Sequence, residues 1–398
     1  MFIFLVFVIS LAAQLFVFVN LGRLSLSLGT LISLQRSLTA LLYVYIFPNS
    51  DILNIFWTSI DCDTWPYSSS FYLPLSSAFC SNILLDKLSL VTTFSLLYSI
   101  FGSIAVACLL RSLLIPLINF FRSSTSASRR HLALLFQIVL YMIIVDPVLS
   151  TYSGSVSKDI FAFSFLAIGF CLLLNRKNLT ILDIIAFIIS FVIVILDRFY
   201  LLSYIGLGLF AGICVQVSRS LLSYHPTLKK SHLTVIIYLV FLFPLVIAIS
   251  LESFRMQSFD LSSATNSIEL YTFSNIENAT LSVPLSIPFY VKYISFWFLP
   301  LFPLQQSLGA IFFSINTLYT LIIVALIFFL PPASTDKGSL LQMSALSFVL
   351  VVSLSFSLTL TNSGLSARYR SSILFPALLF LTYNKFLVSN ASSSNRIS

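Results

Sequence analysis

Charged residues are scarce in this sequence, and their scarcity excludes an ordinary soluble globule. Only 9% of the 398 residues are charged, whereas 58% are hydrophobic, and the mean hydropathy is +1.02. A soluble domain carries roughly 25% charged residues because its surface must face water. Lipid tolerates apolar side chains on the outside of a protein, so the composition predicts an integral membrane protein.

Glycine is also scarce, at 11 residues, and strict alternation of apolar and polar residues is absent. These absences argue against a channel built on glycine-rich helix crossings and against a β-barrel. Long apolar runs are frequent instead, and phenylalanine alone supplies 40 residues. The predicted fold class is therefore all-α, a polytopic helical bundle in the membrane.

About eleven segments are apolar over the roughly 20 residues that a membrane-spanning helix needs. They are 2–20, 29–47, 88–112, 132–149, 159–174, 180–196, 199–218, 233–251, 307–330, 340–360 and 371–387. Segment 284–303 is apolar but interrupted by prolines, which predicts an interfacial or re-entrant piece. We therefore expect a single transmembrane domain over residues 1–388 and a short polar tail at 389–398.

Basic residues divide unevenly between the alternate loops of this layout. One set of loops holds twelve Lys and Arg against two acids, and the other holds seven against eleven. Because basic residues concentrate in cytoplasmic loops, the first set is predicted to lie inside. The N-terminus is then outside and the C-terminus inside, and two large loops, about 48–87 and 252–306, lie on the outer face. This asymmetry explains the net charge of +8 without nucleic acid as a partner.

Several functional classes lack their sequence signature. No G-x-x-x-x-G-K-[ST] motif occurs, so the chain is not a self-contained ATP-driven pump. The five cysteines lack the pair spacing of a metal site, and all three histidines fall in predicted inner loops. We therefore expect no metal, no cofactor and no histidine-dependent chemistry at the outer face. Cys62 and Cys80 share one outer loop and are candidates for a disulfide, while the other cysteines are expected to be packing residues.

The first candidate site is a hydroxyl-rich turn between two predicted spans. Asp146 ends one span, the turn follows at 150–158, and Lys158 and Asp159 open the next span. Charged groups at the ends of spans are costly and tend to be functional. The turn is either an anion pocket, with Lys158 and the hydroxyls as donors, or a capped turn with a local ion pair.

The second candidate site is segment 361–370, where Arg368 and Arg370 flank Tyr369. Both arginines lie on the side that the positive-inside rule disfavours, and this unusual placement indicates a functional role. The planar guanidinium fork suits phosphate, and the tyrosine ring between them could stack on a sugar. Arg198 and Arg255 also lie at the outer boundary, although each is equally explained as an interfacial charge.

These two segments resemble those of a known family. Segment 146–159 resembles the P-S-x-x-x-W-S-S-x-x-x-K-D pattern of bacterial O-antigen and capsular polysaccharide repeat-unit polymerases. Segment 362–376 resembles their later N-x-G-x-x-x-R-Y-R…P pattern. The two motifs cover about 30 of the 398 residues, and this chain departs from the first motif at Val148 and lacks its Trp. The hydropathy profile also fits the family.

The resemblance implies a glycosyltransferase-type polymerase in the inner membrane. A growing glycan on undecaprenyl diphosphate would be transferred with inversion to the non-reducing end of a new lipid-linked repeat unit at the outer face. Lipid diphosphate is then the leaving group, which needs cations more than a metal. The implied partners are the lipid-linked oligosaccharide, the bilayer, a chain-length regulator and a flippase.

The resemblance also implies roles for several residues at the outer face. Asp159 or Asp197 is the implied base for the acceptor hydroxyl, and Tyr369 is the implied sugar-stacking ring. The residues implied to bind the diphosphate are Arg368, Arg370, Lys158, Arg255 and Arg198.

Three other functions remain open from the sequence. A membrane glycosyltransferase that uses a polyprenyl-phosphate sugar would place its catalytic acids at Asp61 and Asp63 in the first outer loop. A transporter or lipid flippase would need polar residues along a path through the membrane. The mid-span candidates for that path are Arg36, Arg111 and Gln137, and the two arginines could instead snorkel to the interface. The last alternative is an assembly scaffold without activity.

Overall fold

The structure is a computed structural model, and the part of the chain that it describes is helical. The described residues are 2–46, 87–123, 127–153, 159–174, 179–197, 201–202, 204–206, 208–210, 213, 289–298, 308–329, 336–359 and 367–383. Within these ranges every regular element is a helix and no strand occurs. The all-α prediction is therefore confirmed for this part of the chain.

The chain forms two compact units. The first comprises Met1–Phe199 together with Arg370–Pro376, and the second comprises Tyr200–Tyr369 together with Ala377–Ser398. A short segment near the C-terminus therefore returns to the unit built by the first half of the chain.

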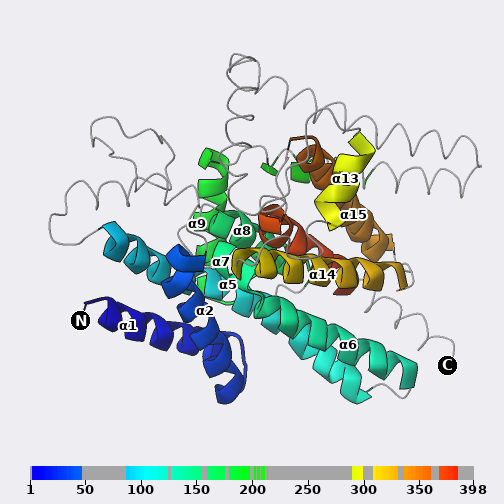
Figure 1. Ribbon diagram of the computed structural model, residues 1–398. Helices are drawn as coiled ribbons and strands as arrows, with labels where there is room; N and C mark the ends of the chain where they lie inside the picture. Colours follow the sequence, from blue (N-terminus) through cyan, green and yellow to red (C-terminus); the bar gives the residue numbers. More distant parts are fainter. Residues whose placement is uncertain are drawn as a thin grey trace, which may run out of the picture. The chain divides into compact units, whose positions relative to one another are not determined.

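Figure 1 shows the helices of both units. Those of the first unit are α1 (Phe2–Phe16), η1 (Val17–Leu21), α2 (Leu26–Ile46), α5 (Lys87–Ser123), α6 (Ala127–Ile144), α7 (Pro147–Tyr152), α8 (Asp159–Leu174), α9 (Ile181–Asp197) and the π-helical turn η5 (Arg370–Leu374). Those of the second unit are α13 (Phe289–Phe298), α14 (Leu308–Phe329) and α15 (Asp336–Thr359).

Most predicted apolar segments coincide with helices to within a few residues. Helix α8 matches segment 159–174, and α9 and α14 deviate by a residue or two from segments 180–196 and 307–330. Helix α13, at 10 residues, is too short to span a bilayer, as the prolines around it led us to expect. Segment 233–251 and the outer loop 48–86 lie outside the described residues.

Two elements differ from the expectation. Helix α5 does not end near residue 112 but continues through Pro116 to Ser123. The segment predicted as one span at 132–149 is divided into α6 and α7 at Asp146 and Pro147. Proline cannot donate to the preceding turn, and Asp146 adopts an extended conformation, with φ −60° and ψ 123°, which ends one helix and starts the next.

Helix α5 is the packing centre of the first unit. It packs against α1, η1, α2, α6, α8 and α9. Leu96, Ala105, Ala107 and Leu110 on α5 are completely buried. A helix that is apolar on all sides and buried on most of them belongs in the interior of a bundle.

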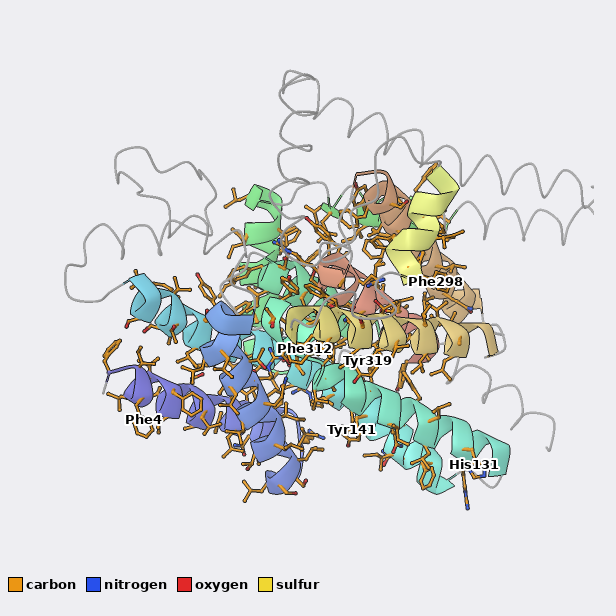
Figure 2. The ribbon with its side chains drawn as sticks, in the orientation of Figure 1. Phe4, His131, Tyr141, Phe298, Phe312 and Tyr319 are labelled. Carbon is orange, nitrogen blue, oxygen red and sulfur yellow. The ribbon has the colours of Figure 1, made fainter. Side chains whose placement is uncertain are left out.

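Other helices expose large apolar side chains. On α1, Phe4 is 70% exposed (Figure 2), and on α9, Ile188 is 54% exposed. Two described helical stretches, Phe2–Leu21 and Ser89–Asn119, are long and apolar enough to cross a membrane, and the other apolar stretches are shorter. Soluble proteins can also contain one or two such helices, so these observations favour membrane association only weakly, and the eleven spans stay a prediction.

Candidate functional site

The turn at Asp146 is a helix cap in the first unit. The Asp146 carboxylate accepts a hydrogen bond from the backbone N–H of Leu149 at 3.0 Å, which caps the N-terminus of α7, and Pro147 occupies the first helical position. An aspartate followed by proline is a favoured start of a helix. Asp146 and Pro147 therefore start α7, and the choice between an anion pocket and a capped turn with a local ion pair stays open, because 154–158 lie outside the described residues.

Arg370 joins this turn from the other end of the sequence. It opens η5, which packs against both α7 and α8, and its side chain is completely buried. The Asp146 carboxylate interacts electrostatically with the Arg370 guanidinium. Two segments that are more than 200 residues apart in the sequence thus meet in one unit.

Asp159 lies on the same set of elements. It is the first residue of α8, it is completely buried, and α8 is one of the two helices on which η5 packs. A carboxylate at a helix N-terminus is stabilised in its charged form by the helix dipole. Asp146, Asp159 and Arg370 are therefore three buried charged residues on adjoining elements of the first unit.

Arg368 and Tyr369 belong to the second unit, where their surroundings differ from those of Arg370. The Tyr369 ring stacks on Phe356, with centroids 4.2 Å apart and ring planes 21° apart. The Arg368 guanidinium lies 5.9 Å from the centroid of the Tyr369 ring, and both residues are partly exposed. Phe356 covers one face of the tyrosine, so a sugar could stack only on the other face.

Residues two apart on a helix point about 200° apart, which explains why Arg368 and Arg370 have different environments. Arg368 is partly exposed, whereas Arg370 is buried in the first unit. Only Tyr369 separates the two arginines in the sequence, yet their side chains differ in burial.

The remaining predicted site residues are only partly covered by the structure. Asp197 is the last residue of α9. The residues that lie outside the described part of the chain are Lys158, Arg198, Arg255, Asp61, Asp63, Cys62, Cys80 and Cys214. Their predicted roles stay predictions.

A buried polar cluster adjoins α7, and sequence reasoning recognised only Arg36 in it. Arg36 on α2 does not snorkel, because its side chain is 1% exposed. Its Nε donates to the Ser103 hydroxyl at 3.1 Å. Its Nη2 donates to the carbonyl and the hydroxyl of Ser153, the residue that caps the C-terminus of α7, at 3.0 and 3.1 Å.

Gln14 extends this cluster into α1. Its amide nitrogen donates to the hydroxyls of Ser10, Ser37 and Ser99 at 3.0, 3.0 and 2.7 Å, and its carbonyl oxygen accepts from Ser103 at 3.2 Å. The cluster therefore links α1, α2 and α5 by side-chain hydrogen bonds. A lone amide in an otherwise apolar run of α1 was the sequence signal for it.

Gln35 holds the middle of α7. Its amide nitrogen donates to the Ser150 hydroxyl at 3.0 Å and to the Val145 carbonyl at 3.2 Å. Gln35 and Arg36 are the tenth and eleventh of the 21 residues of α2, so α7 packs about 15 Å from either end of that helix. The α7 turn therefore lies beside the middle of α2 and not beside its end.

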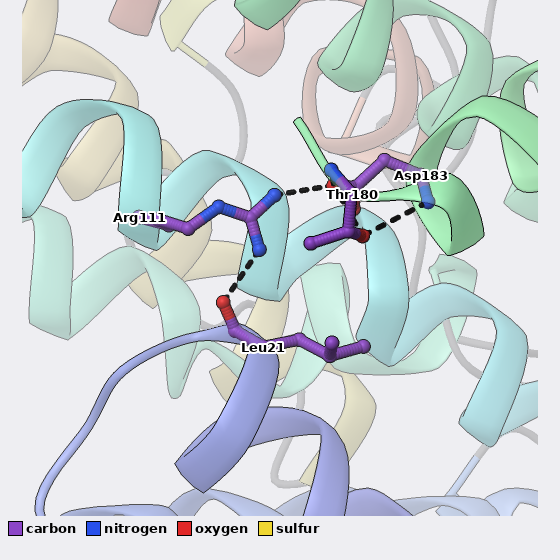
Figure 3. A network of polar contacts seen from close by, with 4 residues as sticks. All are labelled: Leu21, Arg111, Thr180 and Asp183. Atoms are coloured by element: carbon purple, nitrogen blue, oxygen red, sulfur yellow. Dashed lines mark hydrogen bonds and ion pairs between the residues drawn. The ribbon is translucent and has the colours of Figure 1, made fainter. Parts of the chain in front are cut away.

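Arg111, the second mid-span arginine, has a structural role. It forms a buried ion pair with Asp183 of α9 and donates to the carbonyl of Leu21 at the end of η1 (Figure 3). Asp183 also accepts hydrogen bonds from the backbone and the hydroxyl of Thr180, at 2.6 and 2.8 Å, which caps α9. Arg111 thus ties the three helical elements η1, α5 and α9 together.

Among the described residues, no group of three or more His, Cys, Asp or Glu side chains is placed to bind a metal ion. Cys108 and Cys171 are buried free thiols, as expected for packing residues. His131 is exposed near the start of α6 (Figure 2).

Comparison with known proteins identifies no relative. No family profile matches the sequence, and neither the curated proteins nor the solved structures contain a significant match. The functional argument therefore depends on the residues and their geometry.

Proposed function

We propose that this chain is a polytopic inner-membrane polymerase that joins lipid-linked oligosaccharide repeat units at the outer face of the membrane. The observation that supports this proposal is the packing of η5 against α7 and α8. The two segments were selected from the sequence for their charges, and a shared anion site requires them to meet. The η5 segment, which opens with Arg370, packs against α7 and α8, and Arg370 interacts electrostatically with Asp146.

The proposed reaction transfers a glycan from one lipid diphosphate to another lipid-linked sugar. The bond between the anomeric carbon and the diphosphate oxygen breaks, and the acceptor hydroxyl oxygen forms a new bond to that carbon. The acceptor's proton passes to a carboxylate base, for which Asp159 is the buried candidate. Arg370 stabilises the negative charge that develops on the leaving diphosphate.

The membrane part of the proposal is supported by the exposed apolar faces of α1 and α9. If the chain has eleven spans and its N-terminus is outside, α7 lies towards the outer side of the membrane. Because α7 packs beside the middle of α2, this site would lie below the membrane surface, within reach of a lipid-anchored diphosphate. A re-entrant polar backbone at such depth is tolerated where protein surrounds it.

Polymer length in the encoding bacterium tests the proposal. A strain that lacks the gene is complemented with the wild-type chain, with Arg370→Gln, or with Arg130→Gln, which removes the same charge from an exposed position on α6. We expect single repeat units with Arg370→Gln and full-length polymer with Arg130→Gln, at equal amounts of membrane-bound protein. Full-length polymer in the deletion strain, or with Arg370→Gln, contradicts the proposal.

The same strain separates the polymerase from the rival glycosyltransferase. Asp61→Asn and Asp63→Asn change the two acids on which a polyprenyl-phosphate-sugar enzyme would depend. We expect both variants to support full-length polymer. If they abolish the glycan while Arg370→Gln leaves it intact, the rival is favoured.

A further inference from the structure

Among the described residues of the first unit, three arginines are buried, and they differ in how their charge is balanced. Arg36, Arg111 and Arg370 are 1%, 2% and 0% exposed. Arg111 pairs with Asp183, and Arg370 interacts with Asp146. In the part of the chain that the structure describes, no charged side chain pairs with Arg36 or interacts with it electrostatically.

The hydrogen-bond acceptors of Arg36 among the described residues are neutral. Its Nε and Nη2 atoms donate to the oxygens of Ser103 and Ser153. Its Nη1 atom is buried and has no hydrogen-bond partner among the described residues. One edge of the guanidinium group therefore has unused donors.

An arginine side chain keeps its proton inside a protein, so Arg36 remains a cation where it is buried. A buried charge without a counter-charge is strongly unfavourable, and more so among helices that lie in lipid. A water molecule could accept a hydrogen bond from Nη1, but it would not balance the charge. An anionic oxygen satisfies both requirements.

We propose that Arg36 binds a phosphate oxygen of a lipid-anchored ligand. This inference rests on the membrane location in the proposed function, because a phosphate attached to a lipid is an anion that the bilayer delivers to this depth. Two sources share this chemistry, the diphosphate of the lipid-linked substrate and the headgroup of a phospholipid. Arg36 contacts the C-terminal end of α7 and Arg370 lies near its N-terminal end, so the two cations flank a helix about 9 Å long.

The surroundings of Arg36 provide a rigid frame for such a contact. Gly102 places the α5 backbone directly against Ser153, and a Cβ atom on this glycine would be 3.1 Å from Nη2 of Arg36. Ser103 is itself held by Gln14. The guanidinium group is therefore oriented by the protein before a ligand binds, which lowers the entropic cost of binding.

Thermal unfolding of the purified full-length chain in an uncharged detergent tests this inference. The probes are farnesyl diphosphate, phosphatidylglycerol, and farnesol as the uncharged control. For the wild type we expect a phosphate-bearing probe at saturating concentration to raise the unfolding midpoint by roughly 5 °C, and farnesol to leave it unchanged. A response to the diphosphate alone indicates the substrate, and an equal response to phosphatidylglycerol indicates a headgroup.

The variants assign the response to a residue. Arg36→Gln is expected to abolish the rise, measured from its own midpoint without probe. Arg23→Gln removes the same charge from an exposed arginine and is expected to keep the rise. A wild type that no phosphate-bearing probe stabilises, or a full rise in Arg36→Gln, overturns the inference.

Two further variants keep the test decisive. If Arg36→Gln does not fold, Arg36→Lys replaces it in the test. Lysine keeps the positive charge but lacks the planar guanidinium group, so about tenfold more probe should be needed for the half-maximal rise in the unfolding midpoint. Wild-type affinity in Arg36→Lys then overturns the inference. Arg370→Gln separates this site from the proposed function. Because Arg370 binds the diphosphate in the proposed function, this variant should need more farnesyl diphosphate for the half-maximal rise but should not abolish the rise, as Arg36→Gln should. A rise that is lost in Arg370→Gln and kept in Arg36→Gln assigns the phosphate to Arg370, overturns this inference and leaves the polymerase proposal standing.

Discussion

The backbone of Gly102 lies against the carbonyl of Ser153, so closely that a Cβ atom on the glycine would be 1.4 Å from that carbonyl oxygen. The contact joins the middle of α5 to the C-terminal cap of α7, 51 positions further along the chain. Arg36 donates to the same carbonyl oxygen at 3.0 Å. A glycine in the middle of a long helix is thus required for the position of the α7 turn.

Replacing Gly102 by alanine is expected to displace α7. The methyl group cannot fit against a backbone oxygen, so the free energy of unfolding should fall by about 3 kcal/mol or more, as for severe overpacking. Unfolding of the purified protein in detergent measures the loss. Gly169→Ala on α8 is the matched control, because its Cβ would lie 3.4 Å from Phe187 and alanine favours a helix. An equal effect of the two substitutions would contradict this account.

Arg111 and Asp183 are expected to contribute to the free energy of unfolding as a coupled pair. Arg111→Met leaves a buried carboxylate without its cation and should cost about 3–5 kcal/mol of unfolding free energy. The double variant Arg111→Met with Asp183→Asn should cost clearly less than the sum of the single variants. A double-mutant cycle in detergent measures this coupling. Additive effects would show that the pair does not stabilise the junction of η1, α5 and α9.

Asp146 is expected to act in two ways, as a helix cap and as a counter-charge for Arg370. Asp146→Asn keeps a good cap and removes only the charge, whereas Asp146→Ala removes both, so the alanine variant should be less stable by about 1 kcal/mol. Because the asparagine variant leaves Arg370 unbalanced, adding Arg370→Met should restore part of its lost stability. Chemical unfolding of the wild type and the three variants checks the order, and a further loss on adding Arg370→Met would contradict the counter-charge role.

The exposed face of α9 is expected to contact lipid. Ile188 lies near the middle of the helix, and a lysine there should raise the free energy of membrane insertion by about 2.5–3.5 kcal/mol. Ile181, the first residue of α9 and 77% exposed, is the control, because a lysine at a helix end can reach the interface. An insertion assay on the isolated α9 segment and membrane fractionation of the full-length variants measure both effects. Equal, small effects at the two positions would indicate that this face does not lie in a membrane.

Local sequence signals predicted most of the helices, because each depends on a run of apolar residues. The start of α8 at Asp159 and the short α13 between prolines are examples. The division at Asp146 and Pro147 was less apparent, since the apolar run continues across it. Its signal, an aspartate followed by proline, was present in the sequence but carried less weight than hydropathy.

The candidate site was predictable only in part. Arg370 and the Asp159 region were selected from charge placement, and their elements do pack together. The different burial of Arg368 and Arg370 was not foreseen, because sequence adjacency does not show which way a helical side chain points. Gln14 was overlooked because a single amide in an apolar helix has no meaning until its partners on other helices are known.

Composition and charge by themselves determined that this protein is helical and that it has too few charged residues for the surface of a soluble protein. These properties follow from each residue's affinity for water or lipid, which does not depend on its neighbours. Only the tertiary structure decided which buried charges have a counter-charge. Arg36, Arg111 and Arg370 look alike in the sequence, and they differ because the energy of a buried cation depends on the atoms that packing brings to within a few ångströms of it.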